Sequence, residues 1–315
     1  MKTFHILVPT DFSESADLAF EHGIFLANQF EGELHLLHIA ELPTITLPDF
    51  PADLFEVARS QGLSRMRDLI EQQEVTLPPI KRVVMAGTPS EPAADVIVDY
   101  AKANGMDFIV MGTHGRRGAR RLFLGSVTEE VARRAPCPVL TMRAGRTAWP
   151  LPRVERILVP VDFSDSTRDV VGSATRMAEH YGAAVTLLHV VDLEFYPYYG
   201  FGSDPYPMVE KEIMASSDRQ LASLATELQA AGIVTTWLTE KGHTAATIRQ
   251  VADRRDVDMI VIGSHGRSGL DRALMGSVSE KVLRTAHCPV LLVHTADKVI
   301  PKKTERREVA LLMEG

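Results

Sequence analysis

Residues 6–13, ILVPTDFS, recur 151 residues later in the chain as ILVPVDFS at 157–164. A longer stretch repeats at the same spacing: 112–140 and 263–291 share 17 of 29 positions without a gap. Each copy holds about 150 residues, enough to close its own core, so the pattern predicts a duplicated domain rather than a solenoid unit. The most similar segments are glycine-rich loops as well as apolar strands, which indicates a ligand site present in duplicate.

Short apolar runs alternate with amphipathic stretches in each copy, a pattern typical of a parallel sheet covered by helices. Five strands joined by right-handed crossovers predict an α/β fold made of two flavodoxin-like (Rossmann-like) doubly wound domains, each a five-stranded parallel sheet of order 3-2-1-4-5. The predicted domains cover 1–143 and 154–296, with a tail at 297–315. The predicted strands lie at about 5–9, 33–39, 81–85, 107–111, 138–142, 156–160, 184–190, 233–239, 258–262 and 289–293.

A helix is expected after the first strand of each copy. Its buried face in the first copy is predicted to hold Ala16, Ala19, Phe20, Gly23 and Ile24. Ser13 and Ser164 are the predicted caps of these helices.

Composition narrows the class of protein. The net charge of −7 argues against nucleic acid as a main partner, because phosphates need a basic surface. Two cysteines in 315 residues provide no disulfide framework. No signal peptide is visible and no apolar run reaches the roughly 18 residues of a membrane span, so we expect a cytoplasmic protein without a membrane partner.

The repeated loops contain the candidate ligand-binding residues. In each copy a Gly-x2-Gly-x9-Gly-Ser pattern follows the fourth strand, and its last glycine opens a helix whose amides favour phosphate. An aspartate, Asp11 or Asp162, ends the neighbouring first strand, where doubly wound sheets bind ligands. Ser126 and Ser277 could cap their helices in Ser-x-x-Glu boxes or donate a hydroxyl to phosphate. The structural alternative is that the glycines serve turns and the serines serve caps.

These motifs, with Val-Pro-x-Asp, Leu-Leu-His and Cys-Pro-Val at the strands, resemble the universal stress protein family in its tandem form, over nearly the whole chain. The resemblance to the ATP-binding branch implies ATP or AMP, with Mg²⁺ on the phosphates. It also implies that the fifth strands of the two copies pair as an internal pseudo-dimer, with a further homodimer possible. The implied nucleotide-binding residues are Pro9, Thr10, Asp11, Ile39, Met111, Gly112, Gly115, Gly125, Ser126, Val127, Pro160, Val161, Asp162, Val190, Ile262, Gly263, Gly266, Gly276, Ser277 and Val278.

Three functions compete at this point. The leading hypothesis is a nucleotide-binding stress protein whose occupancy biases conformation or the choice of an unidentified protein partner; Gly112→Val or Gly263→Val is then expected to remove one site each while the fold survives. The second is a nucleotide-free interaction module. The third is a slow ATPase or adenylyl-transfer enzyme. No P-loop lysine, metal-binding motif or nucleophile elbow is present in the sequence, so we assign no catalytic or metal-binding residue and expect any ATP hydrolysis to be slow.

Overall fold

A computed structural model of the chain describes residues 3–42, 54–113, 124–143, 154–192, 206–264, 275–294 and 300. Residues 144–153, between the two predicted domains, residues 195–201, whose sequence is FYPYYGF, and nearly all of the predicted tail lie outside these residues. None of the helices in the described part of the chain combines the length and apolar character that crossing a bilayer requires.

Strands and helices alternate along both copies of the repeat, here called the first and second halves. The first half contains β1 (His5–Thr10), α1 (Glu14–Gln29), β2 (Glu33–Glu41), α2 (Leu54–Glu71), β3 (Ile80–Gly87), α3 (Ala93–Ala103), β4 (Phe108–Gly112), α4 (Ser126–Arg134) and β5 (Val139–Met142). The second half contains β6 (Arg156–Pro160), α5 (Thr167–Tyr181), β7 (Ala184–Val191), α6 (Tyr206–Ala230), β8 (Thr235–Lys241), α7 (Thr244–Arg254), β9 (Met259–Gly263), α8 (Ser277–Thr285) and β10 (Val290–Val293).

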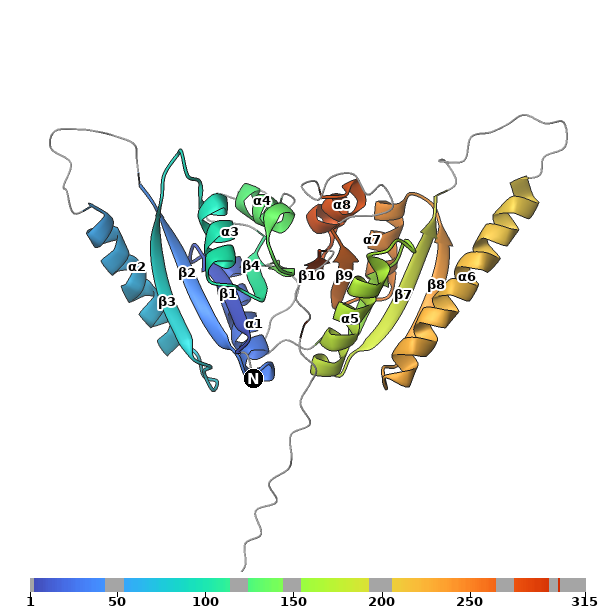
Figure 1. Ribbon diagram of the computed structural model, residues 1–315, viewed down its shortest axis with the longest axis horizontal. Coiled ribbons are helices and arrows are strands. Elements are labelled where there is room, and N and C mark those ends of the chain that lie inside the picture. The colour runs from blue at the N-terminus through green and yellow to red at the C-terminus, as the bar shows by residue number, and fades with distance from the viewer. Residues whose placement is uncertain are drawn as a thin grey trace, which may run out of the picture.

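The strands form one ten-stranded sheet in the order β3-β2-β1-β4-β5-β10-β9-β6-β7-β8. Each half has the predicted order 3-2-1-4-5 and is parallel throughout. The two halves are not separate sheets, however, because β5 pairs antiparallel with β10, Leu140 opposite Leu291. This pairing of the fifth strands gives each of them a partner in place of an open edge. In Figure 1 the two halves accordingly lie side by side, with α2 and α6 on the outer flanks.

Helices cover both faces of the sheet. One face is covered by α1, α2, α5 and α6, which contribute Phe20, Met66, Ala174 and Leu221 to a single apolar cluster. On the other face, α3 and α4 pack over the first half, and α7 and α8 pack over the second. The predicted buried face of α1 is confirmed, with all five of its residues inside.

The start of the equivalent helix in the second half differs from the prediction. Ser13 does occupy the N-cap position of α1, although its side chain makes no capping hydrogen bond. Ser164 is not a cap, since α5 begins at Thr167 after Ser166. The physical reason is local competition: the Ser164 amide and hydroxyl both donate to Asp162 Oδ1, at 3.0 and 2.6 Å.

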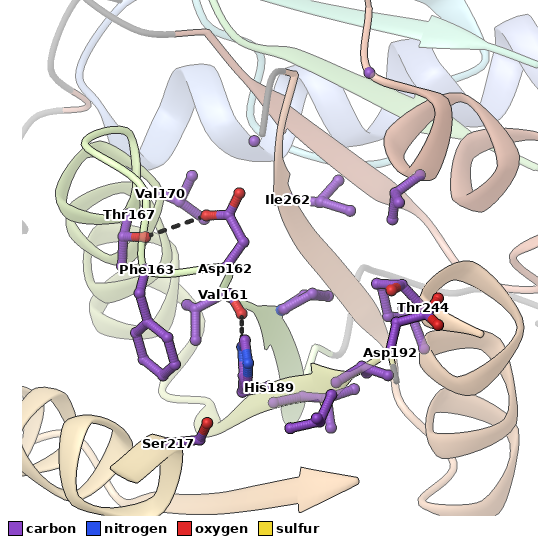
Figure 2. Close-up of a pocket in the computed structure, with 18 of the residues that line it drawn as sticks. Val161, Asp162, Phe163, Thr167, Val170, His189, Asp192, Ser217, Thr244 and Ile262 are labelled. Atoms are coloured by element: carbon purple, nitrogen blue, oxygen red, sulfur yellow. Dashed lines mark hydrogen bonds between the residues drawn. The ribbon is translucent and has the colours of Figure 1, made fainter. Parts of the chain in front are cut away.

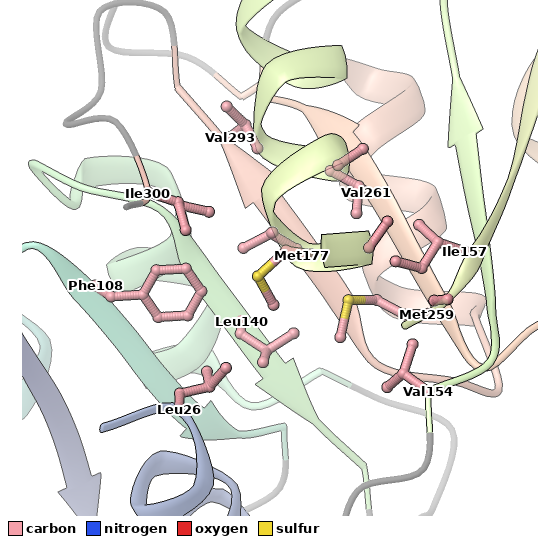
Figure 3. Packing of buried hydrophobic residues seen from close by; sticks show 14 of the residues in the cluster. Leu26, Phe108, Leu140, Val154, Ile157, Met177, Met259, Val261, Val293 and Ile300 are labelled. Carbon is pink, nitrogen blue, oxygen red and sulfur yellow. The ribbon is translucent and has the colours of Figure 1, made fainter. Parts of the chain in front are cut away.

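On the face covered by α1, α2, α5 and α6, one apolar core spans both halves. Figure 3 shows Phe108 and Leu140 of the first half facing Met177, Met259 and Val261 of the second. The contact buries side chains that separate domains would expose to water, so the two halves stabilise each other.

Aromatic side chains extend this contact along α1 and α5. The rings of Phe25 and Tyr181 stack with centroids 5.1 Å apart, and Phe30 meets His180 edge to face at 4.5 Å. The Tyr181 hydroxyl is hydrogen-bonded to His22 Nε2. Burial raises the pKa of Tyr181 and lowers the pKa of His22 to about 3, so both side chains are neutral near pH 7.

His22 is therefore expected to make the fold sensitive to acid. Below pH 6.5 an unfolded chain protonates this histidine, whereas the folded chain keeps it neutral down to about pH 3. Its contribution to stability is complete above pH 6.5 and falls with decreasing pH by up to about 1.4 kcal/mol per unit. Urea unfolding of His22→Gln from pH 7 to 5 should show a shallower pH slope than the parent chain. His243→Gln, which alters an exposed histidine, is the control.

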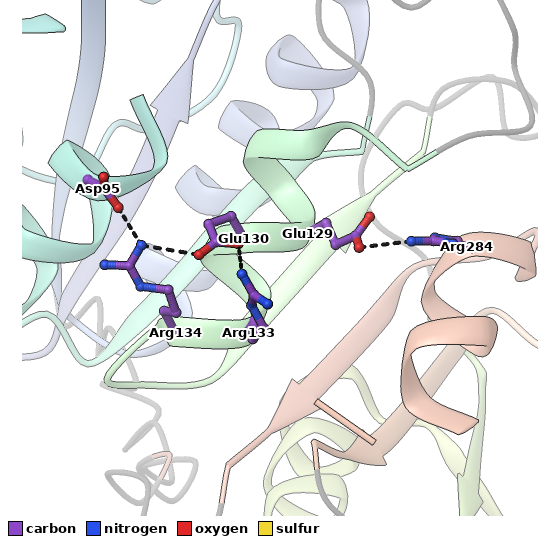
Figure 4. A network of polar contacts seen from close by, with 6 residues as sticks. All are labelled: Asp95, Glu129, Glu130, Arg133, Arg134 and Arg284. Carbon is purple, nitrogen blue, oxygen red and sulfur yellow. Dashed lines mark hydrogen bonds and ion pairs between the residues drawn. The ribbon is translucent and has the colours of Figure 1, made fainter. Parts of the chain in front are cut away.

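Polar contacts link the two halves at the rim of the core. Figure 4 shows Glu129 on α4 paired with Arg284 on α8, at 2.8 Å, beside a network of Asp95, Glu130, Arg133 and Arg134 within the first half. The Arg143 guanidinium donates to the Ala286 carbonyl, and His294 Nε2 lies 3.0 Å from the Ala132 carbonyl. Because exposed ion pairs contribute little stability, these contacts mainly set the orientation of the halves.

Candidate functional site

A cavity of about 690 Å³ opens at the carboxyl ends of β6, β7 and β9 (Figure 2). Its position follows from the topology, because β6 and β9 are neighbours whose following helices pass to opposite faces of the sheet. Its volume falls within the range typical of small-molecule sites.

Nine of the ten residues predicted for the second copy line this cavity. They are Pro160, Val161, Asp162, Val190, Ile262, Gly263, Gly276, Ser277 and Val278. The tenth, Gly266, lies outside the described residues, as does Gly115 in the first copy. The topology therefore brings together strand ends and a helix start that are more than 100 residues apart in the chain.

Asp162 provides the acidic group of the cavity. Its Oδ1 accepts hydrogen bonds from the Ser164 amide and hydroxyl and lies 3.5 Å from the Thr167 hydroxyl, which fixes the carboxylate at the cavity wall (Figure 2). The next residue, Phe163, has φ of 60°, the left-handed region that aromatic residues rarely adopt. This turn directs the following amide back to the aspartate, and Phe12 repeats it in the first half with the same φ.

A histidine on β7 contacts the backbone just after β6. His189 Nδ1 lies 2.8 Å from the Val161 carbonyl, and its ring contacts Phe163 with centroids 4.5 Å apart. In the first half His38 makes the same 2.8 Å contact with the Thr10 carbonyl. Both histidines therefore position the backbone at the end of the first strand of their half, and His189 also lines the cavity.

The amino end of α8 closes the opposite side of the cavity. Gly276 is the N-cap, and the first intrahelical bond runs from the Glu280 amide to its carbonyl at 3.0 Å. The amides of Ser277, Val278 and Ser279 precede that bond, so they have no partner within the helix and favour an anion. The Ser279 hydroxyl donates to the Gly263 carbonyl at 2.6 Å and ties the helix to the end of β9.

The predicted capping boxes do not form. Gly125 and Gly276 are the N-caps, which places Ser126 and Ser277 at the first helical position, exposed to solvent. In the first half a different contact holds the helix start, because the Thr128 hydroxyl donates to the Gly112 carbonyl at 2.7 Å. Of the two exposed serines, Ser277 lines the cavity.

Equivalent positions in the first half carry the same backbone features. Strand ends supply Pro9, Thr10, Asp11, Ile39, Met111 and Gly112, and the start of α4 supplies Gly125, Ser126 and Val127. Asp11 Oδ1 accepts the Ser13 amide at 3.1 Å, which repeats the turn at Asp162.

Side chains around the two sites differ. Arg65 on α2 lies over the Phe12 ring at 4.0 Å from its centroid. Met66 on α2 and Leu221 on α6 are both fully buried, and we take them as equivalent positions. Arg65 then corresponds to Gln220, which lines the cavity of the second half. In addition, burial and the neighbouring Asp11 charge raise the pKa of Asp17.

Several lining residues were absent from the sequence prediction. Asp192 follows β7, Thr244 begins α7, and Ile213, Ser217 and Gln220 project from α6. They lie outside the short motifs that the two copies share, so no sequence pattern marked them. The packing of α6 against β7 and β8 places Ile213, Ser217 and Gln220 at the cavity.

Comparison with known proteins agrees with this architecture. The sequence model of the universal stress protein family matches residues 3–143 and again residues 153–294. A universal stress protein of Methanocaldococcus jannaschii is 29% identical over 145 residues, which cover 46% of this chain and 84% of the relative. A universal stress protein of Mycolicibacterium smegmatis is 26% identical over 303 residues, covering 92% of this chain and 97% of the relative.

The crystal structure of a universal stress protein from Archaeoglobus fulgidus shares the fold, with a TM-score of 0.62 at 22% identity over 92% of this chain and 96% of that one. The family pattern thus occurs twice here, in a sheet that its fifth strands join at the centre. This chain belongs to the universal stress protein family.

Proposed function

We propose that this chain is a stress-response protein that binds ATP or AMP at one site in each copy of the repeat. The observation that carries the proposal is the cavity at the fork of β6 and β9, because it combines an apolar wall, a fixed carboxylate and the amino end of a helix. An apolar wall can contact the base of a nucleotide, and a carboxylate can accept hydrogen bonds from the ribose hydroxyls. The amino end of a helix can bind the phosphates.

In the second half, Val161, Val190 and Ile262 would contact the base, and Asp162 would accept hydrogen bonds from the ribose. The amides of Ser277, Val278 and Ser279, which follow Gly276 at the start of α8, would hold the phosphates. Mg²⁺ would bind mainly through phosphate oxygens and water, as it does in most nucleotide sites. The corresponding groups of the first half would form a second site, with Arg65 making its affinity unequal to the first.

The same arrangement supports the proposed division of the chain into nucleotide-binding units at 1–143 and 154–296. Occupancy would act through conformation or choice of protein partner in the cytoplasm. Residues described here provide carboxylate, hydroxyl and amide groups at the cavity, and these bind and orient a nucleotide.

A nucleotide-free interaction module remains the second candidate, favoured by one observation. A Cβ at Gly112 would lie 2.6 Å from the Ser15 hydroxyl and 2.7 Å from the Ser15 carbonyl carbon, so this glycine already has a packing role. The glycine pattern alone therefore does not distinguish nucleotide binding from a nucleotide-free interaction module, and a binding experiment is needed to distinguish them.

Calorimetric titration of the nucleotide-stripped chain with Mg-ATP should give two sites. Asp162→Ala is expected to weaken the second-half site at least about tenfold, the equivalent of roughly 1.4 kcal/mol, by removing the charge-assisted hydrogen bond to ribose. Asp162→Asn, which retains a side-chain oxygen for Ser164, shows whether the loss comes from charge or from the turn. Asp169→Ala, at an exposed carboxylate on the following helix α5, is the control.

The titration also distinguishes the alternatives. Absence of heat with a folded chain would overturn nucleotide binding and favour the interaction module. Two sites accompanied by turnover near the 10 s⁻¹ of ordinary enzymes would instead indicate an ATP-consuming enzyme.

A further inference from the structure

Three potential metal ligands meet at the amino edge of the sheet, at the opposite end of β1 from Asp11. His5 begins β1 and lies opposite Glu33, the first residue of β2. His35 follows Glu33 by two residues, so its side chain is on the same face of the sheet. Six residues of β1 place this edge roughly 20 Å from the nucleotide end, so the cluster is separate from the site proposed above.

The donor atoms are spaced for a single cation. Nε2 of His5 lies 3.8 Å from Glu33 Oε2, and Nε2 of His35 lies 3.5 Å from Glu33 Oε1. One ligand atom from each of the three residues falls within 4.8 Å of the others. Ligands at about 2.1 Å around a tetrahedral Zn²⁺ are about 3.4 Å apart, so small side-chain movements complete the geometry.

A hydrogen bond orients His35, and a carboxylate lies near the second ring nitrogen of His5. The Tyr100 hydroxyl lies 2.8 Å from His35 Nδ1, which directs Nε2 of that ring at Glu33. For His5 the corresponding neighbour is the Asp107 carboxylate, 3.8 Å from Nδ1, and the same carboxylate accepts the His5 amide at 3.0 Å. Metal-binding histidines are commonly held in this way by a partner on the other ring nitrogen.

The cluster is partly shielded from water. Side chains of His35 and Asp107 are each 6% exposed, whereas His5 and Glu33 are 26% and 33% exposed. The inner histidine is thus held among packed groups, while the other two ligands leave a path for a cation and a water molecule.

We propose that His5, Glu33 and His35 bind one divalent transition-metal ion of the zinc type, with water in the fourth position. Two imidazoles and one carboxylate match the ligand preference of Zn²⁺ and of its spectroscopic substitute Co²⁺. The ion would fasten the starts of β1 and β2 and is distinct from any Mg²⁺ carried by a nucleotide.

Charges around the cluster favour this assignment. Among the described residues, Glu33 and Asp107 supply negative charge beside the two histidines, and Lys81 lies opposite His35 on β3. A metal binds neutral imidazoles and an ionised carboxylate, so acid should release the ion.

The second half shows that the fold does not require this cluster. At the three equivalent positions it carries Arg156, Ala184 and Thr186, although the strands pair in the same register. Arg156 lies 3.5 Å from Asp258, the counterpart of Asp107, and so forms an ordinary ion pair there. We therefore expect one metal ion per chain rather than two.

The test is a titration of the full-length, untagged, metal-stripped chain with Co²⁺ and Zn²⁺ at pH 7.5 and pH 5. Co²⁺ should produce saturable visible bands of a four-coordinate ion at one equivalent per chain, which Zn²⁺ displaces and pH 5 abolishes. His35→Gln and Glu33→Gln should each remove the bands. Tyr100→Phe should weaken binding by about tenfold, the usual effect of losing an orienting partner.

Controls keep the result independent of folding and of nucleotide. His243→Gln, at an exposed histidine, should bind Co²⁺ like the parent chain, and the apo variants should unfold at temperatures near that of the parent. Zn²⁺ should raise the unfolding temperature of the parent and leave that of His35→Gln unchanged. Absence of a saturable spectrum, or an unchanged spectrum in both His35→Gln and Glu33→Gln, would overturn the proposal whether or not ATP binds.

Discussion

Phe108→Ala is expected to lower the free energy of unfolding by about 3–5 kcal/mol, the usual cost of removing a buried aromatic ring. Phe108 has no exposed surface and lies in the cluster that both halves share (Figure 3). The cavity left by the ring would lie against residues of both halves, which cannot collapse onto it without disturbing the sheet.

Urea unfolding followed by circular dichroism measures this effect. Because the core is shared, we expect both halves to lose stability together, in one transition that moves as a whole. Val234→Ala is the control, since Val234 is 72% exposed and its truncation should change stability by less than about 0.5 kcal/mol. A variant with one half unfolding early and the other unchanged would contradict the shared core.

Gly112→Ala is expected to destabilise the fold by about 1–3 kcal/mol, and Gly112→Val by more. The added Cβ would lie 2.6–2.8 Å from Ser15 atoms, two of which belong to the backbone and cannot rotate away. The close contact changes one part of the expectation from sequence, because Gly112→Val should cost stability instead of sparing the fold. The glycine allows α1 to approach the end of β4 closely.

A matched control is available in the second half. Gly172 lies inside α5 with no atom within 4 Å of the position a Cβ would take. Gly172→Ala should therefore stabilise the chain by up to about 1 kcal/mol, because alanine favours helix. Thermal unfolding of the two alanine variants should move in opposite directions, and equal stability of Gly112→Ala and the parent would disprove the close approach.

The strand order within each half was predictable because it depends on local patterns. Apolar runs such as 157–160 identify a buried strand, and an amphipathic stretch such as 16–24 identifies the helix that crosses to the next one. Given right-handed crossovers, few arrangements remain, and Asp162 and Gly263 must then end neighbouring strands.

Details of the helix starts were not predictable in the same way. Ser126 and Ser277 match a capping box in sequence, yet glycine occupies the N-cap in both helices. The difference arises because Thr128 and Ser279 bind carbonyls at the ends of β4 and β9, contacts to another element that no local pattern reveals.

By itself, the sequence determined the duplication, the class of fold, and the meeting of aspartates and glycines at the carboxyl ends of strands, because all three follow from patterns within short segments. The family resemblance implied that β5 and β10 pair, and the structure confirms it. Only the tertiary structure decided that Phe108 and Met259 share a core. It also decided that His5 and His35 face one carboxylate, because that contact depends on the register between β1 and β2. The register between two strands depends on how whole elements pack, and the spacing of residues along the chain does not reveal it.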